Sequence, residues 1–447
     1  MTTMVSKHAL LFATSVATMG GFLFGYDTAV INGANELLKE YFNLDAAGLG
    51  IATASAVIGC IPGAAIAGTL SDRYGRKKVL YLTAILFGVS AILSALPFTL
   101  TQFLIARFIG GIGIGIASMV CPVYIAECSP ADKRGRLGTL FQFGIVLGIF
   151  VTLFINLFIQ NLGDLDWNIQ FGWRWMLGAE VFPSLAFLGL IALSPESPRW
   201  LVMQGRIDQA KQILLRWSDD AFASKEILAI QETLEQKRGN FLELFQKRFR
   251  KPLIAALGLM IIQQFCGINA IIYYSTSIFS ASGAGMADAF ISTVIVGFVN
   301  MIFTIVAISF VDKAGRRPLL IIGLIGQFFA LSTVAILFGN GSESSILLIA
   351  VLVFIASFAM SIGPIGWLFA SEVFPSRYRG RAMSLASFTI WVSTYIVAQM
   401  FPILNEGIGA SATFWIFAGV SLFGIFFVLK MVPETKGKTL EEIEKAW

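Results

Sequence analysis

Long apolar stretches recur along almost the whole chain and alternate with short polar segments. A stretch of about 20 apolar residues is long enough for an α-helix to cross the hydrocarbon core of a bilayer. Helices are expected because they satisfy their backbone hydrogen bonds within the segment. The pattern therefore predicts an all-α membrane protein with twelve transmembrane helices, near residues 10–33, 48–70, 78–97, 100–124, 138–160, 172–194, 252–280, 288–311, 318–339, 345–371, 381–404 and 411–432.

One longer polar stretch separates the sixth predicted span from the seventh. Within it, apolar residues recur at helical spacing over 207–215 and 227–234, which predicts two short amphipathic helices. The stretch divides the chain into two sets of six spans. We expect four parts: an N-terminal half, a linker with short helices, a C-terminal half and a tail, over residues 1–198, 199–250, 251–432 and 433–447.

Composition and charge agree with this pattern and also orient the chain. Apolar residues make up 56% of the sequence and charged residues only 13%, and the mean hydropathy is +0.78. Basic residues gather in the loops after the second, fourth, eighth and tenth spans. Because such loops favour the cytoplasmic side, both termini and the linker are expected there. The net charge of +5 thus reflects membrane orientation and does not indicate nucleic-acid binding. We expect a multi-pass protein of the plasma membrane, which in a bacterium is the inner membrane.

The residue pattern gives no support to enzymatic chemistry. The four cysteines lie in or next to predicted spans without zinc-like spacing, and the single histidine, His8, lies at the N-terminal edge. We find no set of nucleophile, base and metal-binding residues. The sequence therefore predicts a protein that is not an enzyme and that needs no cofactor or metal.

Three motifs of the first six spans return, in the same order, in the last six. In each case the two copies follow equivalent spans and lie on the same predicted side of the membrane. Such a pattern indicates two six-helix halves related by a parallel internal repeat. The pairs are 72–78 with 312–318, 127–136 with 372–381, and 195–199 with 433–437.

Two opposite charges lie at the same predicted depth in the N-terminal half. Asp27 lies among apolar residues in the first span, and Arg107 lies among apolar residues in the fourth. If the first span ends near Asn35 and the fourth begins near Thr99, both charges lie about 12 Å from the outer surface at ~1.5 Å per residue. An ionisable group inside a membrane is costly without a partner. We therefore expect Asp27 to pair with Arg107 and to lose and regain a proton.

Several carboxamides fall inside predicted spans. Gln263 and Asn269 lie in the seventh span, Asn300 lies near the middle of the eighth, and Gln142 lies in the first turns of the fifth. A carboxamide both donates and accepts hydrogen bonds, as sugar hydroxyls do, without placing a charge in the membrane. From the residues alone, these amides either bind a polar, uncharged ligand or hold helices together.

Together, these motifs resemble the major facilitator superfamily and, within it, the sugar porter family. The resemblance covers essentially the whole chain. It is closest to bacterial proton–sugar symporters and to the facilitative glucose transporters of animals. The most specific motifs are 72–78, 195–200, 263–269 with 273–275, 363–367 and 433–437.

The resemblance implies roles for single residues. Facilitative relatives have an asparagine at the position of Asp27, which favours proton coupling through Asp27 and Arg107 here. Trp367 matches a tryptophan that lines the inner side of the sugar site. The residues that match sugar-binding amides are Gln142, Gln263, Gln264, Asn269 and Asn300.

Further residues are expected to act as gates. Tyr273 and Tyr274 belong to the motif of the seventh span, and Gly363 and Pro364 interrupt the tenth span, which predicts a hinge. In the family, charges in the loops of both halves brace the outward-facing state. A single surface pair contributes only about 0–1 kcal/mol, but a network can bias a small conformational difference. The charged residues in question are Arg76, Glu127, Arg134, Arg316, Glu372 and Arg379.

The sequence thus predicts a secondary active transporter that carries a monosaccharide, a hexose or a pentose, into the cell together with a proton by alternating access. A facilitative uniporter of the same fold, in which the Asp27–Arg107 pair is only structural, is the first alternative. A drug–proton antiporter is disfavoured by the amide-rich seventh span, and a membrane sugar sensor is disfavoured by the short tail. The expected partners are the sugar, the proton and the bilayer, and the protein is expected to function as a monomer.

Overall fold

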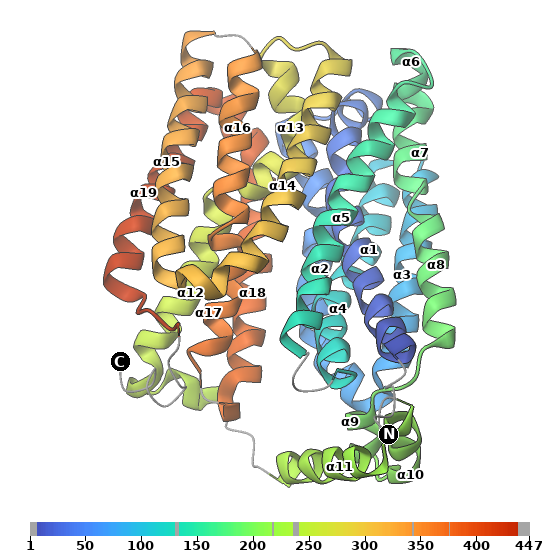
Figure 1. The fold of residues 1–447 in the computed structure, drawn as a ribbon. Helices are drawn as coiled ribbons and strands as arrows, with labels where there is room; N and C mark the ends of the chain where they lie inside the picture. The colour runs from blue at the N-terminus through green and yellow to red at the C-terminus, as the bar shows by residue number, and fades with distance from the viewer. Residues whose placement is uncertain are drawn as a thin grey trace.

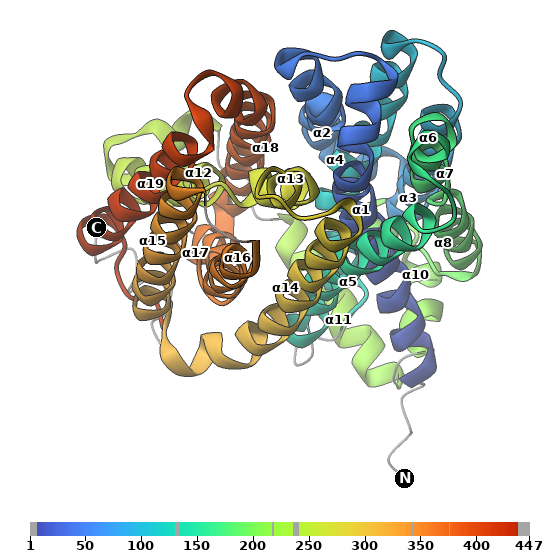
Figure 2. The same cartoon turned by 90° about the horizontal axis from the view of Figure 1, so that it is seen from above.

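The structure, a computed structural model, describes residues 7–129, 134–216, 219–235, 241–341, 344–374 and 376–436. Within these ranges every regular element is a helix (Figure 1). The helices form two bundles that lie side by side, and a group of short helices packs below one of them (Figures 1 and 2). We call the end that carries these short helices the linker end, and the other the opposite end.

The N-terminal bundle contains the first six predicted spans. α2 and α4 pack closely because they meet through glycines: a Cβ atom at Gly111 would lie 1.8 Å from the backbone oxygen of Ala56. Such close helix packing through small residues is common in membranes. The helices are α1 (Lys7–Tyr41), α2 (Ala46–Tyr74), α3 (Arg76–Ala95), α4 (Leu100–Glu127), α5 (Arg134–Gln160), α6 (Leu165–Trp167), η1 (Asn168–Gly172), α7 (Trp173–Gly178) and α8 (Val181–Leu193).

The sixth span, predicted as one helix over 172–194, is instead built from α6, the π-helical η1, α7 and α8. The buried Asn168 explains the irregular start. Its amide nitrogen donates to the backbone oxygens of Gln160, Gly163 and Asp164, at 2.9 to 3.1 Å. A side chain that bonds nearby backbone in this way competes with the regular helical pattern.

The linker helices match the sequence prediction closely. The predicted helix over 207–215 coincides with α10, and the one over 227–234 lies inside the longer α11. Trp200 fixes this group to the N-terminal bundle, because its indole N–H donates to the backbone oxygen of Asp72 at 2.9 Å. The elements are α9 (Pro198–Met203), α10 (Ile207–Leu215), α11 (Asp220–Glu235), η2 (Phe241–Phe245) and η3 (Lys247–Phe249).

The C-terminal bundle contains the other six spans, and two of these spans are broken. The seventh breaks at Cys266 and Gly267, where Gly267 has a φ of +90° that favours glycine. The tenth breaks between Ala359 and Ile362. The helices are α12 (Arg250–Phe265), α13 (Ile268–Ala281), α14 (Met286–Ala314), α15 (Arg316–Asn340), α16 (Ser344–Ala359), α17 (Ile362–Glu372), α18 (Ser376–Gly407) and α19 (Gly409–Met431).

The break in the tenth span lies slightly earlier than the sequence indicated. We expected Gly363 and Pro364 to interrupt the helix, but both lie in the first turn of α17. Proline is tolerated there because the first-turn N–H groups have no partner within the helix. The seventh-span break, in contrast, was not predicted.

By length and apolar composition, eleven segments of the described residues are able to cross a membrane. α1, which contains the first predicted span, is not among them, although it is 35 residues long. Three polar residues of α1, Asp27, Asn32 and Asn35, are buried inside the protein.

The two bundles meet through α2 and α18, α5 and α14, and α1 and α13. The hydrogen bonds between these helices lie toward the opposite end. The Gln399 side chain of α18 donates to the backbone oxygen of Ala47 at the start of α2, at 3.2 Å. Gln160 at the end of α5 lies 3.1 Å from the sulfur of Met286 at the start of α14.

Candidate functional site

A buried ion pair lies in the N-terminal bundle, as predicted. Asp27 of α1 and Arg107 of α4 are 0% and 2% exposed. Arg107 Nη1 bonds to Asp27 Oδ1, and Arg107 Nη2 donates to the backbone oxygen of Asp27 at 2.9 Å. Asp27 Oδ2 and Arg107 Nε have no hydrogen-bond partner among the described residues. The carboxylate therefore keeps one oxygen for another bond.

A third buried ionisable group belongs to this site, and we did not predict it. Glu180 lies between α7 and α8, is 1% exposed, and interacts electrostatically with both Asp27 and Arg107. Its Oε1 has no partner among the described residues. The signal was present in the sequence, since Glu180 is a lone carboxylate inside an apolar span, as Asp27 is.

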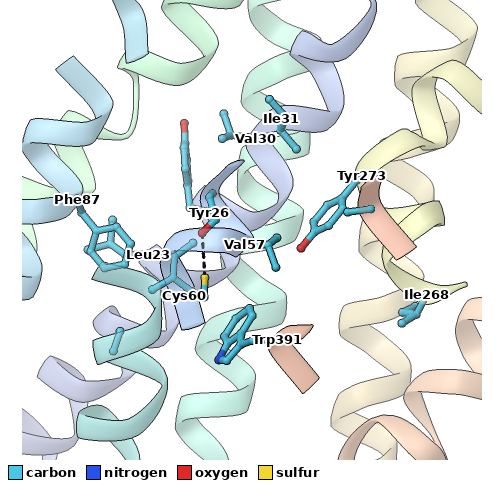
Figure 3. Close-up of a cluster of buried hydrophobic side chains, with 14 of the residues drawn as sticks. Leu23, Tyr26, Val30, Ile31, Val57, Cys60, Phe87, Ile268, Tyr273 and Trp391 are labelled. Carbon is cyan, nitrogen blue, oxygen red and sulfur yellow. Dashed lines mark hydrogen bonds between the residues drawn. The ribbon is translucent and has the colours of Figure 1, made fainter. Parts of the chain in front are cut away.

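A small cavity connects this ion pair with the C-terminal bundle. Its volume is about 10 Å³, roughly the space of one water molecule. Arg107 and Cys60 line it from one bundle, and Tyr273 and Trp391 line it from the other. Figure 3 shows Tyr273 and Trp391 beside Val57 and Cys60. Arg107 thus borders the same small space as two side chains of the second bundle.

The predicted amides of the seventh span gather at its break. Gln264 Oε1 accepts hydrogen bonds from Asn269 Nδ2, at 2.5 Å, and from Thr394 Oγ1 of α18, at 3.1 Å. Gln263 Nε2 donates to the backbone oxygens of Ile362 and Gly363, at 2.9 and 2.7 Å. Gln263 Oε1 has no partner in the described part of the chain. These amides are therefore held in place and still offer a free acceptor.

The other predicted ligand residues lie on separate helices. Asn300 is buried on α14, Gln142 is half-buried on α5, and Trp367 is half-buried on α17. Among the described residues, no side-chain hydrogen bond joins these three to the amides of the seventh span. Their assignment as sugar ligands stays a prediction.

An asparagine pair on α1 joins the two bundles, and its role was also not predicted. Asn32 Nδ2 donates to Ser275 Oγ at 2.7 Å, and Asn32 Oδ1 accepts from Thr276 Oγ1 at 2.5 Å. Asn35 Nδ2 donates to the backbone oxygen of Tyr273 at 2.7 Å. We call Asn32, Asn35 and these three partners on α13 the asparagine latch. All five residues are buried, so these bonds form away from competing water.

Of the predicted gating tyrosines, Tyr273 lines the cavity and its backbone oxygen belongs to the latch. Tyr274 is buried, and its hydroxyl donates to the backbone oxygen of Ala398 in α18 at 2.8 Å. Tyr273 thus takes part in a contact between the bundles and Tyr274 in a contact within the C-terminal bundle, and their role as gates stays a prediction.

At the linker end, the internal repeat is visible in atomic detail. In the N-terminal bundle, Arg76 Nε donates to Glu127 at 2.7 Å, and Ser197 Oγ donates to the same carboxylate at 2.6 Å. Glu196 accepts from the backbone N–H groups of Arg76 and Lys77, at 3.0 and 3.1 Å. We call Arg76, Glu127, Glu196 and Ser197 the N-terminal clasp.

The C-terminal clasp consists of Arg316, Glu372, Glu434 and Thr435, and it has the same arrangement. Arg316 Nη2 donates to Glu372 at 3.0 Å, and Thr435 Oγ1 donates to it at 2.6 Å. Glu434 accepts from the backbone N–H groups of Arg316 and Arg317, at 3.0 Å each. In each clasp, the arginine follows a glycine that separates two helices, Gly75 or Gly315, with φ of +95° or +90°.

Glu196 and Glu434, the clasp carboxylates that accept backbone N–H bonds, have pKa values shifted in opposite directions. Burial raises the pKa of Glu196 above its ordinary value, and the bonds from Ser197, Lys77 and Arg76 only partly offset this. Burial also acts on Glu434, but the backbone N–H groups around it outweigh burial and hold its pKa below the ordinary value. At equivalent positions, Glu196 is thus harder to ionise than an ordinary glutamate and Glu434 is easier to ionise.

The predicted gating charges fall mainly in these clasps. The ion pairs described, Arg76 with Glu127 and Arg316 with Glu372, join residues of the same bundle. Arg379 is half-buried on α18, with no hydrogen-bond partner described for its Nε. The side chain of Arg134 lies outside the described part of the structure. Bracing between the two halves stays a prediction.

Residues 13–447 match a family model described as "Sugar (and other) transporter". The chain belongs to this family. The arabinose-proton symporter of Bacillus subtilis is 39% identical over 446 residues, which cover 99% of this chain and 96% of the relative. The D-xylose-proton symporter of Escherichia coli is 39% identical over 481 residues, which cover 100% and 97%.

Solved structures agree with this assignment. The inward open conformation of the xylose transporter XylE from E. coli matches with a TM-score of 0.88 and 39% identity, over 98% of this chain and 100% of that one. The same transporter bound to 6-bromo-6-deoxy-D-glucose matches with a TM-score of 0.81 and 38% identity, over 98% and 99%. The protein therefore has the major facilitator fold and is a multi-pass membrane transporter, not an enzyme.

Proposed function

We propose that this protein is a proton-coupled symporter that carries a monosaccharide, a hexose or a pentose, across the cell membrane by alternating access. One observation carries the proposal: a buried aspartate, Asp27, pairs with Arg107 through one oxygen and keeps the other oxygen free. A uniporter does not need an ionisable group at this depth, where a charge is costly. The names of relatives that are 39% identical, an arabinose-proton and a D-xylose-proton symporter, support the same conclusion.

The sugar site in this proposal lies between the bundles, at the break of the seventh span. The free Oε1 of Gln263 accepts a sugar hydroxyl, while Gln264 and Asn269 offer further amide groups. Gln142 and Asn300 approach from α5 and α14, and the Trp367 ring covers an apolar sugar face. The monomer expected from the sequence stays the proposed functional unit.

The linker end is cytoplasmic in this proposal. The loops that join α2 to α3 and α14 to α15 lie at that end and are basic, as cytoplasmic loops are. The bonds between bundles lie toward the opposite end, and the clasps at the linker end close within each bundle. The higher TM-score to the inward open XylE structure supports an inward-facing state for the present structure.

Coupling follows from the two sites and one conformational change. The halves, with the boundaries predicted from the sequence, rock about the substrate while the asparagine latch opens and closes. Protonation of Asp27 removes its negative charge and weakens its hold on Arg107. Because the cavity links Arg107 to Tyr273 and Trp391, a change in the ion pair reaches the residues beside the sugar site.

Transport into proteoliposomes tests the proposal. The purified protein is reconstituted, and uptake of labelled xylose, arabinose and glucose is measured with and without an inward proton gradient, together with proton entry. We expect at least one sugar to accumulate above equilibrium only with the gradient, and protons to enter with it. Uptake that stops at equilibrium and moves no protons would establish the uniporter alternative.

A further inference from the structure

The unpaired oxygen of Asp27 faces a space that exists because residue 110 is a glycine. A Cβ atom built on Gly110 of α4 would lie 2.9 Å from Asp27 Oδ2 and 2.4 Å from Ser90 Oγ. Both distances are too short for real contacts with a Cβ atom. Two side-chain oxygens, from α1 and α3, therefore lie close to the same point, and the space beside Gly110 is too small for a methyl group.

The hydroxyl of Ser90 faces this gap only as an acceptor. Ser90 is 0% exposed, and its Oγ donates to the backbone oxygen of Ala106 at 2.9 Å. A serine hydroxyl has a single hydrogen, so that bond leaves Ser90 Oγ with lone pairs alone. Lone pairs form no hydrogen bond with a carboxylate, but they accept one from the O–H of a carboxylic acid. Ser90 thus favours a protonated Oδ2, whereas Arg107 favours the ionised carboxylate.

We propose that Gly110 and Ser90 shape the proton-binding position of Asp27. Gly110 leaves the room that the O–H at Oδ2 needs, and Ser90 Oγ accepts the hydrogen bond from that O–H. The inference rests on the proposed symport, which supplies the proton: water on one side of the membrane gives it to Oδ2, and water on the other side takes it back. Gly110 and Ser90 do not ionise, so they are positioning residues.

Gly110 allows close packing against Ser90 of α3, whose Cβ would lie 3.0 Å from a Cβ at this position, and, unlike its neighbour, it also faces Asp27 Oδ2. Gly111 faces the backbone of α2, where a side chain would collide with the oxygen of Ala56. Gly110 instead faces the oxygens of two polar side chains. Gly113 has room, since a Cβ atom there would lie 3.4 Å or more from its neighbours. The three glycines of one helix therefore give a test variant, a packing variant and a control.

Several titratable or charged groups surround Asp27 and share its electrostatic environment. They act on any pH dependence of this site and must be kept unchanged in the test. From the helices packed around α1, they are Arg107 of α4, Glu180 before α8, Cys60 of α2 and Tyr273 of α13.

The test compares Gly110→Ala, Ser90→Ala and the control Gly113→Ala in proteoliposomes. For each variant, we measure sugar exchange without a gradient, the number of protons that enter per sugar, and gradient-driven accumulation against pH. Gly110→Ala should keep sugar exchange within a few-fold of the parent but lose proton entry and accumulation. Ser90→Ala keeps the room but loses the acceptor, so the pH of half-maximal accumulation should fall by about one unit, the tenfold effect of one buried hydrogen bond. Gly113→Ala should match the parent.

The outcomes separate this inference from the proposed function. If the parent itself moves no protons with sugar, both fail. If the parent is coupled while Gly110→Ala and Ser90→Ala keep its proton-to-sugar ratio and its pH profile, only the inference fails. If Gly110→Ala loses exchange as well, because it folds poorly, the pH profile of Ser90→Ala decides: an unchanged profile overturns the inference, and a profile displaced to lower pH supports it.

Discussion

Asn35 and Tyr273 are 238 residues apart in the sequence, and a hydrogen bond of 2.7 Å joins them in the structure. The bond connects α1 to α13 and, with the bonds of Asn32, forms the asparagine latch that holds the bundles together toward the opposite end. Thr53 Oγ1 donates to Asn35 Oδ1 at 2.9 Å, so the asparagine is fixed from the side of α2 as well. Both polar groups of the Asn35 side chain are thus used.

Asn35→Ala should open this latch. The variant removes the bond to Tyr273, and a lost buried hydrogen bond costs about 1–3 kcal/mol. Because about 1.4 kcal/mol is a tenfold change in an equilibrium, the outward-facing population should rise several-fold. Labelling of a cysteine introduced between the bundles at the opposite end should speed up accordingly. The exposed Asn161→Ala is the control, and equal labelling rates in the two variants would remove the latch role from Asn35.

Asp27→Asn should separate sugar movement from proton movement. The variant keeps size and hydrogen-bonding capacity but holds the site in a permanently neutral form. Accumulation driven by a proton gradient should disappear, while sugar exchange continues because the amides at the seventh-span break are untouched. Arg107 then lies buried without its counter-charge, which can slow the cycle by itself. The deciding measurement is therefore the proton-to-sugar ratio: a slow variant that still moves one proton per sugar would make the pair structural.

Gln263→Ala should weaken sugar binding without unfolding the protein. It removes the free Oε1 acceptor and both bonds to the first turn of α17. Loss of a hydrogen bond to the sugar, about 1 kcal/mol, should raise KM by roughly five- to tenfold. The measurement is the sugar dependence of uptake beside the exposed control Gln170→Ala. Parent-like KM values for xylose, arabinose and glucose would show that Gln263 only holds α12 against α17.

The pKa values of Glu434 and Glu196 are shifted in opposite directions, and this predicts opposite effects of pH on the stability that each contributes. The pKa of Glu434 lies below its ordinary value of 4.5, so this carboxylate stabilises the folded protein above that pH, and the contribution is lost as the pH falls below it. The stability advantage of the parent over Glu434→Gln should therefore shrink between about pH 5 and pH 3. Unfolding temperatures of the purified variants measure this difference.

Glu196→Gln is the matched comparison. The pKa of Glu196 is raised, so its ionisation opposes folding, and the parent should lose stability relative to this variant as the pH rises through 4.5. If both variants shift in the same direction with pH, the backbone N–H groups around Glu434 do not set its charge state.

The sequence predicted most of the fold because apolar length and loop charge are local signals. The breaks were harder. Gly363 and Pro364 indicated a break in the tenth span, but the helix breaks just before them, at Met360 and Ser361. The break in the seventh span includes a positive φ at Gly267. Neither a positive φ nor a π-helical turn leaves a periodic pattern in the sequence.

The sequence predicted part of the candidate site, because that part also leaves local signals. Asp27 and Arg107 are single charges in apolar spans, and their depth could be calculated from helix rise alone. Glu180 carries the same signal and was missed. Asn32 and Asn35 were missed because an amide in a span is ambiguous until its partner is known, and their partners are supplied by the other bundle. A single sequence gives little direct information about contacts between distant parts of the chain.

The clasps and the asparagine latch differ in which parts of the molecule their bonds join. Every clasp bond described here closes inside one bundle, whereas every latch bond crosses from one bundle to the other. Damage to a clasp thus lowers the resistance of one bundle to heat or denaturant, and damage to the latch changes the rate at which the transporter turns over. We therefore expect stability and turnover rate to depend mainly on different residues, at different ends of the molecule.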